Sequence, residues 1–167
     1  MTGYLLFDHG SSCIVALILV IAAFSLRLWA LASKERLVNE NLITTGPYAW
    51  LRHPRYLSTF LYLAAFVSMC RPITVGMALC APTLWMHANE IALEERYLRK
   101  RYGNRHTEYV AAVSLILPWR IRPASLPTTK LSSWQEAVRT KAFRKHAVAA
   151  GIIFAGSGFL VYLNCIR

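Results

Sequence analysis

Four long apolar segments limit what this chain can fold into more than any other feature. They cover Ser12 to Ser33, Tyr56 to Cys70, Ile73 to Ala92 and Ala147 to Asn164. Each supplies about the length of apolar helix that a hydrocarbon core of ~30 Å requires. Only 16% of the residues are charged, against roughly a quarter in soluble domains. We therefore predict an all-α membrane bundle of about four transmembrane helices.

Two of these segments have an alternative assignment. The second is the shortest, and it could form a tight hairpin with the third through Arg71-Pro72, where proline breaks a helix. The first could be a signal peptide, but residues 1 to 11 carry no Lys or Arg and include Asp8. Its apolar run is also longer than the apolar region of a typical signal peptide. We therefore expect an uncleaved anchor at the start of the chain.

The distribution of basic residues predicts the orientation. Of nineteen Lys and Arg residues, four lie between Lys34 and Arg55 and twelve between Arg96 and Lys145. Cytoplasmic loops carry such an excess, so both stretches should face the cytoplasm, with both termini on the other side. This bias accounts for the net charge of +11 without a nucleic-acid partner. Membrane lipids are the expected partners of these residues.

The chain shows no repeat, but its character changes after Trp119. We predict a core over residues 1–119 and a C-terminal region over residues 120–167, in which Trp134 to His146 forms a basic amphipathic helix at the cytoplasmic interface. This helix leads into the fourth span. The four cysteines show no paired metal spacing, so we predict packing roles for them and no metal site.

Arg27 is the least expected residue in its surroundings, because it lies inside the first apolar segment. An arginine in hydrocarbon costs at least ~2.5 to 3.5 kcal/mol on insertion scales, so a function is the default hypothesis. The alternative is that its long side chain reaches the headgroups near Lys34. Arginine suits carboxylate or phosphate, which would allow Arg27 to hold an anionic lipid-like substrate.

A turn-rich loop separates the first two apolar segments. Gly46-Pro47 predicts a turn, and Pro54 excludes an α conformation at His53, so the next helix should begin at or just after Pro54. The start of that helix, with Arg52 and His53 beside it, could hold an anionic ligand. The alternative is a basic membrane anchor in which Tyr48, Trp50 and Tyr56 form an aromatic belt.

Three carboxylates lie at the end of the third apolar segment and just after it. Helical spacing places Glu90 and Glu94 on one stripe and Glu95 with Arg99 on another. Glu95 and Arg99 could be an ordinary surface pair worth ~0.3 kcal/mol. Glu90 or Glu94, near the bilayer edge, could instead bind a cationic group. Together with the loop and Arg27, these residues suit a zwitterionic cofactor beside a lipid substrate.

In this order the motifs resemble those of the isoprenylcysteine carboxyl methyltransferase family and its phospholipid methyltransferase relatives. The resemblance spans roughly residues 25 to 120. It is carried by Leu26-Arg27-Leu28-Trp29-Ala30, then Leu42-Ile43-Thr44-Thr45-Gly46-Pro47-Tyr48 through Arg52-His53-Pro54-Arg55-Tyr56, then Glu94-Glu95-Arg96-Tyr97-Leu98 with Tyr102-Gly103, Tyr109 and Pro118. Any one piece alone would be weak, but the ordered set is specific.

The resemblance implies an all-helical membrane methyltransferase without a Rossmann domain. S-adenosyl-L-methionine would bind in a cytoplasmic pocket, and a lipidic or prenylated acceptor would enter from the bilayer. The resemblance assigns His53, the backbone near Tyr48, and Glu94 or Glu95 to the cofactor, and Arg27 to the acceptor carboxylate. Our full prediction for the cofactor site is Tyr48, Arg52, His53, Tyr56, Glu94 and Glu95. Our prediction for catalysis and the acceptor is Arg27, Glu90 and Glu94.

The acceptor group has two candidates at this point. A carboxylate, as in isoprenylcysteine carboxyl methylation, arrives deprotonated and needs no base, whereas a phospholipid amine must lose a proton, which Glu90, Glu94 or His53 could accept. Glu90 stands where isoprenylcysteine members tend to have a basic residue, and this departure weakens the case for a carboxylate.

Other classes of function remain as alternatives. A membrane reductase would bind a nicotinamide cofactor and a scaffold protein would bind neither cofactor, while a transporter is disfavoured because no inverted repeat is evident. The short length and spare loops favour a multi-pass protein of a prokaryotic inner membrane. The oligomeric state is not readable from the sequence.

Overall fold

The computed structural model describes residues 9–35, 42–70, 73–117 and 139–165. Its long helices are α1 (His9–Glu35), α2 (Pro54–Met69), α3 (Ile73–Tyr102) and α6 (Lys141–Cys165). The described residues also form a short 3₁₀ helix, η1 (Gly46–Ala49), and a short helix, α4 (Asn104–Ala112). The described residues contain no strand beyond one isolated bridge between Leu51 and Ser114. The predicted all-α class is confirmed for this part of the chain.

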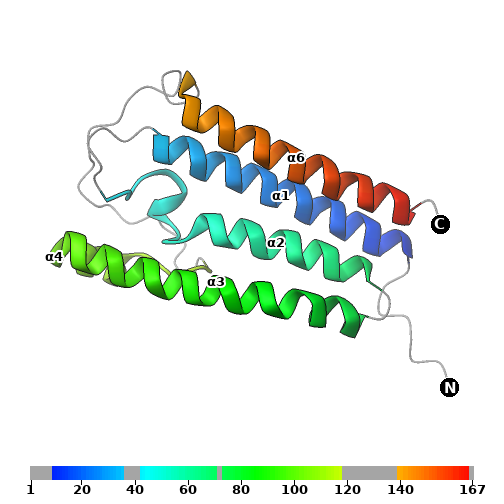
Figure 1. Ribbon diagram of the computed structural model, residues 1–167, viewed down its shortest axis with the longest axis horizontal. Helices are drawn as coiled ribbons and strands as arrows, with labels where there is room; N and C mark the ends of the chain where they lie inside the picture. The colour runs from blue at the N-terminus through cyan, green and yellow to red at the C-terminus, as the bar shows by residue number, and fades with distance from the viewer. Residues whose placement is uncertain (1–8, 36–41, 71–72, 118–138, 166–167) are drawn as a thin grey trace.

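The four long helices lie side by side in the order α6, α1, α2, α3 (Figure 1). Residues from α1 and α2 form one apolar cluster around Ala16, Val20 and Ala65, and Phe154 of α6 packs against it. Phe154 also meets Phe24 of α1, with ring centroids 4.5 Å apart. The C-terminal helix therefore packs as part of the bundle.

Small residues let α2 and α3 approach closely at one end. A Cβ added to Gly76 would lie 2.7 Å from Cys70 Cβ and 3.3 Å from Val67 Cα. Val67 lies in the last turn of α2 and Cys70 directly follows this helix, so α2 and α3 pack closely at this end. Arg71-Pro72, through which the sequence allowed a tight hairpin, lies outside the described residues.

The membrane prediction is supported only in part. Within the described residues, one helix, Ser12–Lys34 with a mean hydropathy of 2.5, is long and apolar enough to cross a bilayer. A bundle of four spans is not confirmed: α2 has 16 residues, fewer than the ~20 that a span needs. Residues 134 to 138 of the predicted amphipathic helix lie outside the described residues, and Lys141 to His146 belong to α6.

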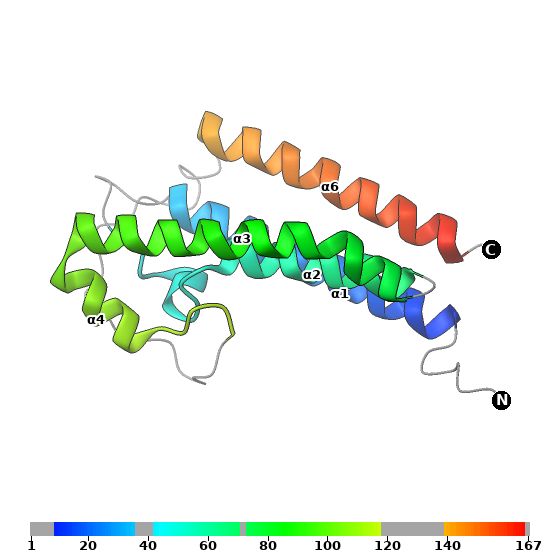
Figure 2. The same ribbon diagram turned by 60° about the horizontal axis from the view of Figure 1, so that its bottom comes forward.

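The ends of α1 and α3 and the start of α2 meet at one end of the bundle. Figure 2 shows α4 folding back beneath the end of α3. Gly103 makes this reversal possible, because its φ of +52° is a left-handed conformation that suits glycine, and its amide donates to the Arg99 carbonyl at 3.0 Å. A second apolar cluster, Leu42, Tyr109 and Val113, then joins α4 to the loop before η1.

Candidate cofactor pocket

The loop between α1 and α2 has the local structure that its sequence predicts. Pro47 lies in the first turn of η1, and α2 begins at Pro54. His53 precedes α2 with φ −126° and ψ 60°, outside the α region, as expected for a residue before proline. The amides of Arg52 and His53 donate to the carbonyls of Ser114 and Leu115, at 2.8 and 3.1 Å. The chain after α4 therefore supports this loop.

This end of the bundle contains a cavity of about 500 Å³. Its walls come from the end of α1, the loop around η1, the start of α2, the end of α3 and α4. The lining includes cationic, acidic and aromatic side chains. They are Lys34, Arg52, Arg55, Arg101, His53, Glu94, Tyr48, Tyr56, Tyr97, Tyr102 and Tyr109, with Leu42, Ile43, Pro54 and Leu98.

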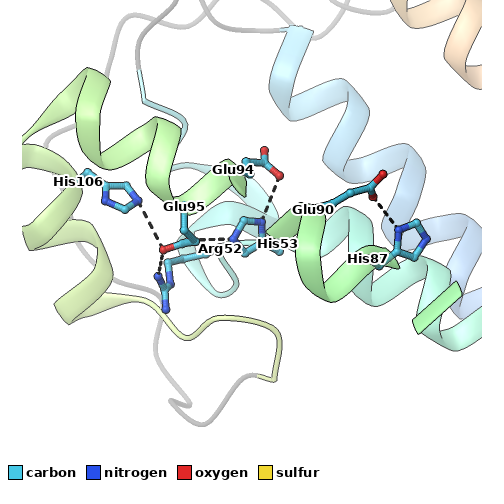
Figure 3. A network of polar contacts seen from close by, with 7 residues as sticks. All are labelled: Arg52, His53, His87, Glu90, Glu94, Glu95 and His106. Carbon is cyan, nitrogen blue, oxygen red and sulfur yellow. Dashed lines mark hydrogen bonds and ion pairs between the residues drawn. The ribbon is translucent and has the colours of Figure 1, made fainter. Parts of the chain in front are cut away.

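Glu95 is the centre of a polar network beside this cavity (Figure 3). Its Oε1 lies 2.7 Å from His53 Nε2, and its Oε2 lies 2.5 Å from Arg52 Nη1. The Nε2 atom of His106 lies 3.7 Å from the same Oε2. The Glu95 side chain is only 18% exposed. Glu95 therefore joins α3 to the loop before α2, and the alternative of a surface pair with Arg99 is wrong.

The neighbouring Glu94 has a different environment. Its side chain is 45% exposed and lines the cavity, and its Oε2 lies 3.6 Å from Nδ1 of the buried His53. The two ring nitrogens of His53 thus face two different carboxylates (Figure 3). Glu95 holds the loop in place, while Glu94 offers a carboxylate to a ligand in the cavity.

The carboxylates and the imidazole shift each other's pKa values. Burial disfavours the charged form of His53, but its hydrogen bonds to Glu94 and Glu95 outweigh burial, so the pKa of His53 is raised. The hydrogen bond to His53 lowers the pKa of Glu94. Burial opposes the same shift at Glu95, yet His53 and the Arg52 charge lower the pKa of Glu95. The network therefore favours a protonated His53 between two ionised carboxylates.

This network makes stability depend on pH in a defined direction. A raised pKa in the folded state gives a contribution that is complete below the unfolded value of about 6.5 and is lost as pH rises through the folded value. We expect the free energy of unfolding to fall above pH 6.5 in wild type more steeply than in His53→Gln. Equilibrium unfolding in mixed micelles between pH 5.5 and 9 measures this free energy for both proteins. Parallel curves for the two proteins would contradict the assignment.

Two tyrosines shape the far wall of the cavity. The Tyr109 hydroxyl of α4 donates to the Tyr48 carbonyl of η1 at 2.8 Å. Burial raises the pKa of Tyr48 to about 12 and raises that of Tyr109 as well. Both phenols are therefore neutral at physiological pH, and they act as hydrogen-bonding and aromatic walls.

Arg27 and Glu90 lie outside the lining of this cavity. Arg27 is half-buried, and its Nη1 lies 3.5 Å from Ser58 Oγ and 3.4 Å from Thr59 Oγ1, both on α2. Its guanidinium therefore contacts α2 in the apolar bundle. Glu90 bonds to His87 instead of a cavity residue. Of the six residues predicted to bind the cofactor, all but Glu95 line this cavity, and Glu95 lies beside it. Arg27 and Glu90 lie apart from them.

Sequence reasoning missed two histidines. His106 of α4 is fully buried, and neither of its ring nitrogens has a hydrogen-bond partner within the described residues. Nothing in the sequence connects His106 with Glu95, because the reversal at Gly103 brings them together. His87 lies three residues before Glu90 on the same helix, so helical spacing could have identified this pair.

The described residues contain no group of three or more His, Cys, Asp or Glu side chains that could hold a metal ion. Cys80 is a buried free cysteine on α3. Cys13, in contrast, is disulfide-bonded, so the prediction of a packing role alone is wrong for this residue.

The chain is similar in sequence to several known proteins. The chain is 34% identical over 88 residues to human protein-S-isoprenylcysteine O-methyltransferase, covering 51% of this chain and 30% of that protein. The corresponding protein B of Arabidopsis thaliana is 29% identical, covering 48% and 41%. The cobalt-zinc-cadmium resistance protein CzcN of Cupriavidus metallidurans is 27% identical, covering 81% and 58%. The chain thus spans less than half the length of the two isoprenylcysteine relatives.

No solved structure gives a significant match to the chain. The model of the phospholipid methyltransferase family matches residues 1–105, which include the loop before α2 and both glutamates of the Glu94-Glu95 pair. The family resemblance seen in the motifs is thereby confirmed, and the chain belongs to the phospholipid methyltransferase family.

Proposed function

We propose that this protein transfers a methyl group from S-adenosyl-L-methionine to a lipidic acceptor. The observation that carries the proposal is the cavity at the end of an apolar bundle, where the Glu94 carboxylate faces cations and tyrosine rings. Its volume of about 500 Å³ lies within the usual range for small-molecule sites. When bound, S-adenosylmethionine supplies a methyl group that its sulfonium has already activated.

The chemistry of the lining fits a ligand with both charges. Glu94 would hold the ammonium group or the ribose hydroxyls, and Arg55 with the positive end of α2 would attract the carboxylate. Tyr48 and Tyr56 would offer aromatic walls. Within the described residues, Arg52 Nε and both ring nitrogens of His106 are buried without a hydrogen-bond partner. The protein's main task would be to orient the partners and exclude water.

Several features support a membrane location with the cavity on the cytoplasmic face. Large apolar side chains are exposed along three helices, for example Ile18 (60%), Leu79 (63%) and Ile152 (68%), and such surfaces are rare on soluble monomers. Cys13, near the start of α1, is disulfide-bonded, and disulfides persist in oxidising compartments. The cavity lies near the other end of α1, beside Lys34. We propose four spans in a prokaryotic inner membrane.

Two acceptor groups are consistent with this proposal. The names of the isoprenylcysteine relatives favour carboxylate O-methylation, with Arg27 as the residue that would hold the carboxylate. N-methylation of a phospholipid amine is the second candidate, and the His87–Glu90 pair specifically favours an acceptor that must lose a proton. A nicotinamide-dependent reductase or a scaffold remains the competing class.

Calorimetric binding of S-adenosylhomocysteine to the detergent-purified protein tests the proposal. Wild type should bind, and Glu94→Gln should bind at least about tenfold more weakly, because a hydrogen bond to a charged group contributes ~1.5 to 3 kcal/mol. Glu108→Gln is the matched control, since Glu108 is an exposed glutamate on α4. A folded wild type that binds a nicotinamide nucleotide and no S-adenosylhomocysteine would identify a reductase; binding of neither would indicate a scaffold.

A further inference from the structure

Midway along α3, outside the cofactor cavity, a histidine and a glutamate form a hydrogen-bonded pair. His87 Nδ1 lies 2.8 Å from Glu90 Oε2 (Figure 3). An ionised carboxylate only accepts hydrogen bonds, so Nδ1 carries the proton and donates it to Glu90. In a neutral imidazole this leaves Nε2 with a free lone pair. The pair therefore presents a proton acceptor whose tautomer Glu90 determines.

The neighbours of His87 place it next to the cofactor cavity. Its ring meets the edge of Tyr56 on α2, with centroids 5.4 Å apart, and Phe60 lies 6.3 Å away. Tyr56 lines the cavity and also contacts the His53 ring at 5.7 Å. One aromatic ring thus separates His87 from the residues proposed to hold the methyl donor.

The pair is accessible from the apolar surface. The side chains of His87 and Glu90 are 17% and 47% exposed. Around them on α3, Leu84, Trp85, Met86 and Leu93 are all exposed large apolar residues.

A purely structural role does not account for the pair. Two helical side chains three residues apart stabilise a helix by only ~0.2 to 0.5 kcal/mol. Placing a charged side chain in the apolar zone costs more, up to ~2.5 to 3.5 kcal/mol at its centre, and such residues are functional by default. The carboxylate that orients an imidazole is the arrangement by which histidine acts as a general base.

We propose that His87, oriented by Glu90, takes the proton from the acceptor as it is methylated, so that the acceptor nucleophile is an N–H or O–H group. This inference rests on the proposed methyl transfer. The acceptor lone pair forms a bond to the methyl carbon, and the carbon–sulfur bond breaks with its electron pair going to sulfur. The proton of the N–H or O–H group moves to His87 Nε2, and Glu90 stabilises the imidazolium. A carboxylate acceptor releases no proton and has no use for the pair.

The variant His87→Asn tests the role of this histidine. An asparagine amide can still donate to Glu90, but it has no nitrogen lone pair to accept a proton. We expect methyl transfer to slow by roughly 10²- to 10⁴-fold, the usual contribution of general base catalysis, while affinity for S-adenosylhomocysteine stays unchanged. His146→Asn, at an exposed histidine on α6, is the matched control. A wild-type rate in folded His87→Asn would overturn the proposal.

The class of acceptor is tested with methyl-labelled S-adenosylmethionine and membranes that contain the wild-type protein. Methyl esters release volatile methanol in mild alkali, whereas N-methyl and ether products keep their label. We expect the label to survive alkali, and nitrogen or oxygen attachment in the product then distinguishes amine from hydroxyl acceptors. Release of the label as methanol would show a carboxylate acceptor, overturning this inference while leaving the proposed methyl transfer intact.

A third measurement does not depend on turnover. Nitrogen NMR of histidine-labelled protein should show His87 as the neutral Nδ1–H tautomer, and Glu90→Gln should remove this preference. A proton on Nε2 of neutral His87 would overturn the inference whatever the transfer assay shows. Failure of the wild type to bind S-adenosylhomocysteine would instead count against the proposed function.

Discussion

Replacing Glu95 by glutamine is expected to abolish measurable binding of S-adenosylhomocysteine and to lower the free energy of unfolding by roughly 3 kcal/mol. Glu95 is the carboxylate that faces both Arg52 and His53, whose side chains are 13% and 3% exposed. Removing its charge leaves the poorly solvated Arg52 without a carboxylate partner and leaves His53 with Glu94 alone, and breaking a buried pair in this way costs more than the pair itself contributes. Binding would fail because the same contacts hold the loop that forms the cavity wall.

Equilibrium unfolding in mixed micelles and calorimetry measure the two effects of Glu95→Gln. Glu108→Gln controls for the loss of one negative charge from the same end of the protein, because Glu108 is exposed. If Glu95→Gln unfolds like wild type, Glu95 cannot be the centre of the network. If it is destabilised yet binds normally, the loop does not depend on Glu95 for its bound conformation.

Gly46→Ala is expected to destabilise the protein by roughly 2 to 5 kcal/mol, for two separable reasons. Gly46 has φ +64°, a left-handed conformation that a residue with a Cβ adopts at a cost of ~1 to 2 kcal/mol. A Cβ there would also lie 2.3 Å from Oγ of Ser33 on α1. The loop would have to move away from α1, and the cofactor cavity would change shape with it.

Gly103→Ala is the matched control for this substitution. Gly103 also has a positive φ, +52°, but an added Cβ would meet nothing within 4 Å. Thermal unfolding should therefore show the backbone cost alone, ~1 to 2 kcal/mol, and Ser33→Ala should recover part of the loss in Gly46→Ala by removing Oγ. Equal losses in the two glycine variants would show that the loop does not pack tightly against α1.

The helices were the most predictable part of this protein. Their positions follow from apolar runs and from local backbone chemistry, and α2 begins at Pro54 for the reason that the His53-Pro54 pair supplies. The number of membrane spans was less predictable. Among the described residues, length and hydropathy identify only Ser12–Lys34 as a span on its own. The other long helices combine apolar runs with polar extensions or are short.

Most of the residues that we predict to bind the cofactor line one cavity, and the family motifs contain them. Their separate roles were not predictable. Helical spacing placed Glu94 and Glu95 on different stripes of α3, but the rotation of α3 against the loop decides which glutamate is buried and which lines the cavity. His106 shows the same limit, since it reaches Glu95 only because the chain reverses at Gly103.

The sequence by itself determined the helical class, the family and which polar residues lie at one end of the bundle. These properties depend on the lengths of apolar runs, on prolines and on ordered motifs, all of which are features of the chain read residue by residue. Only the tertiary structure decided the pairings. It directed Arg27 to the hydroxyls of α2, Glu90 to His87, and Glu95 to Arg52 and His53. Such pairings depend on how helices distant in sequence are packed and rotated against one another, and that arrangement minimises the exposure of charge to an apolar interior.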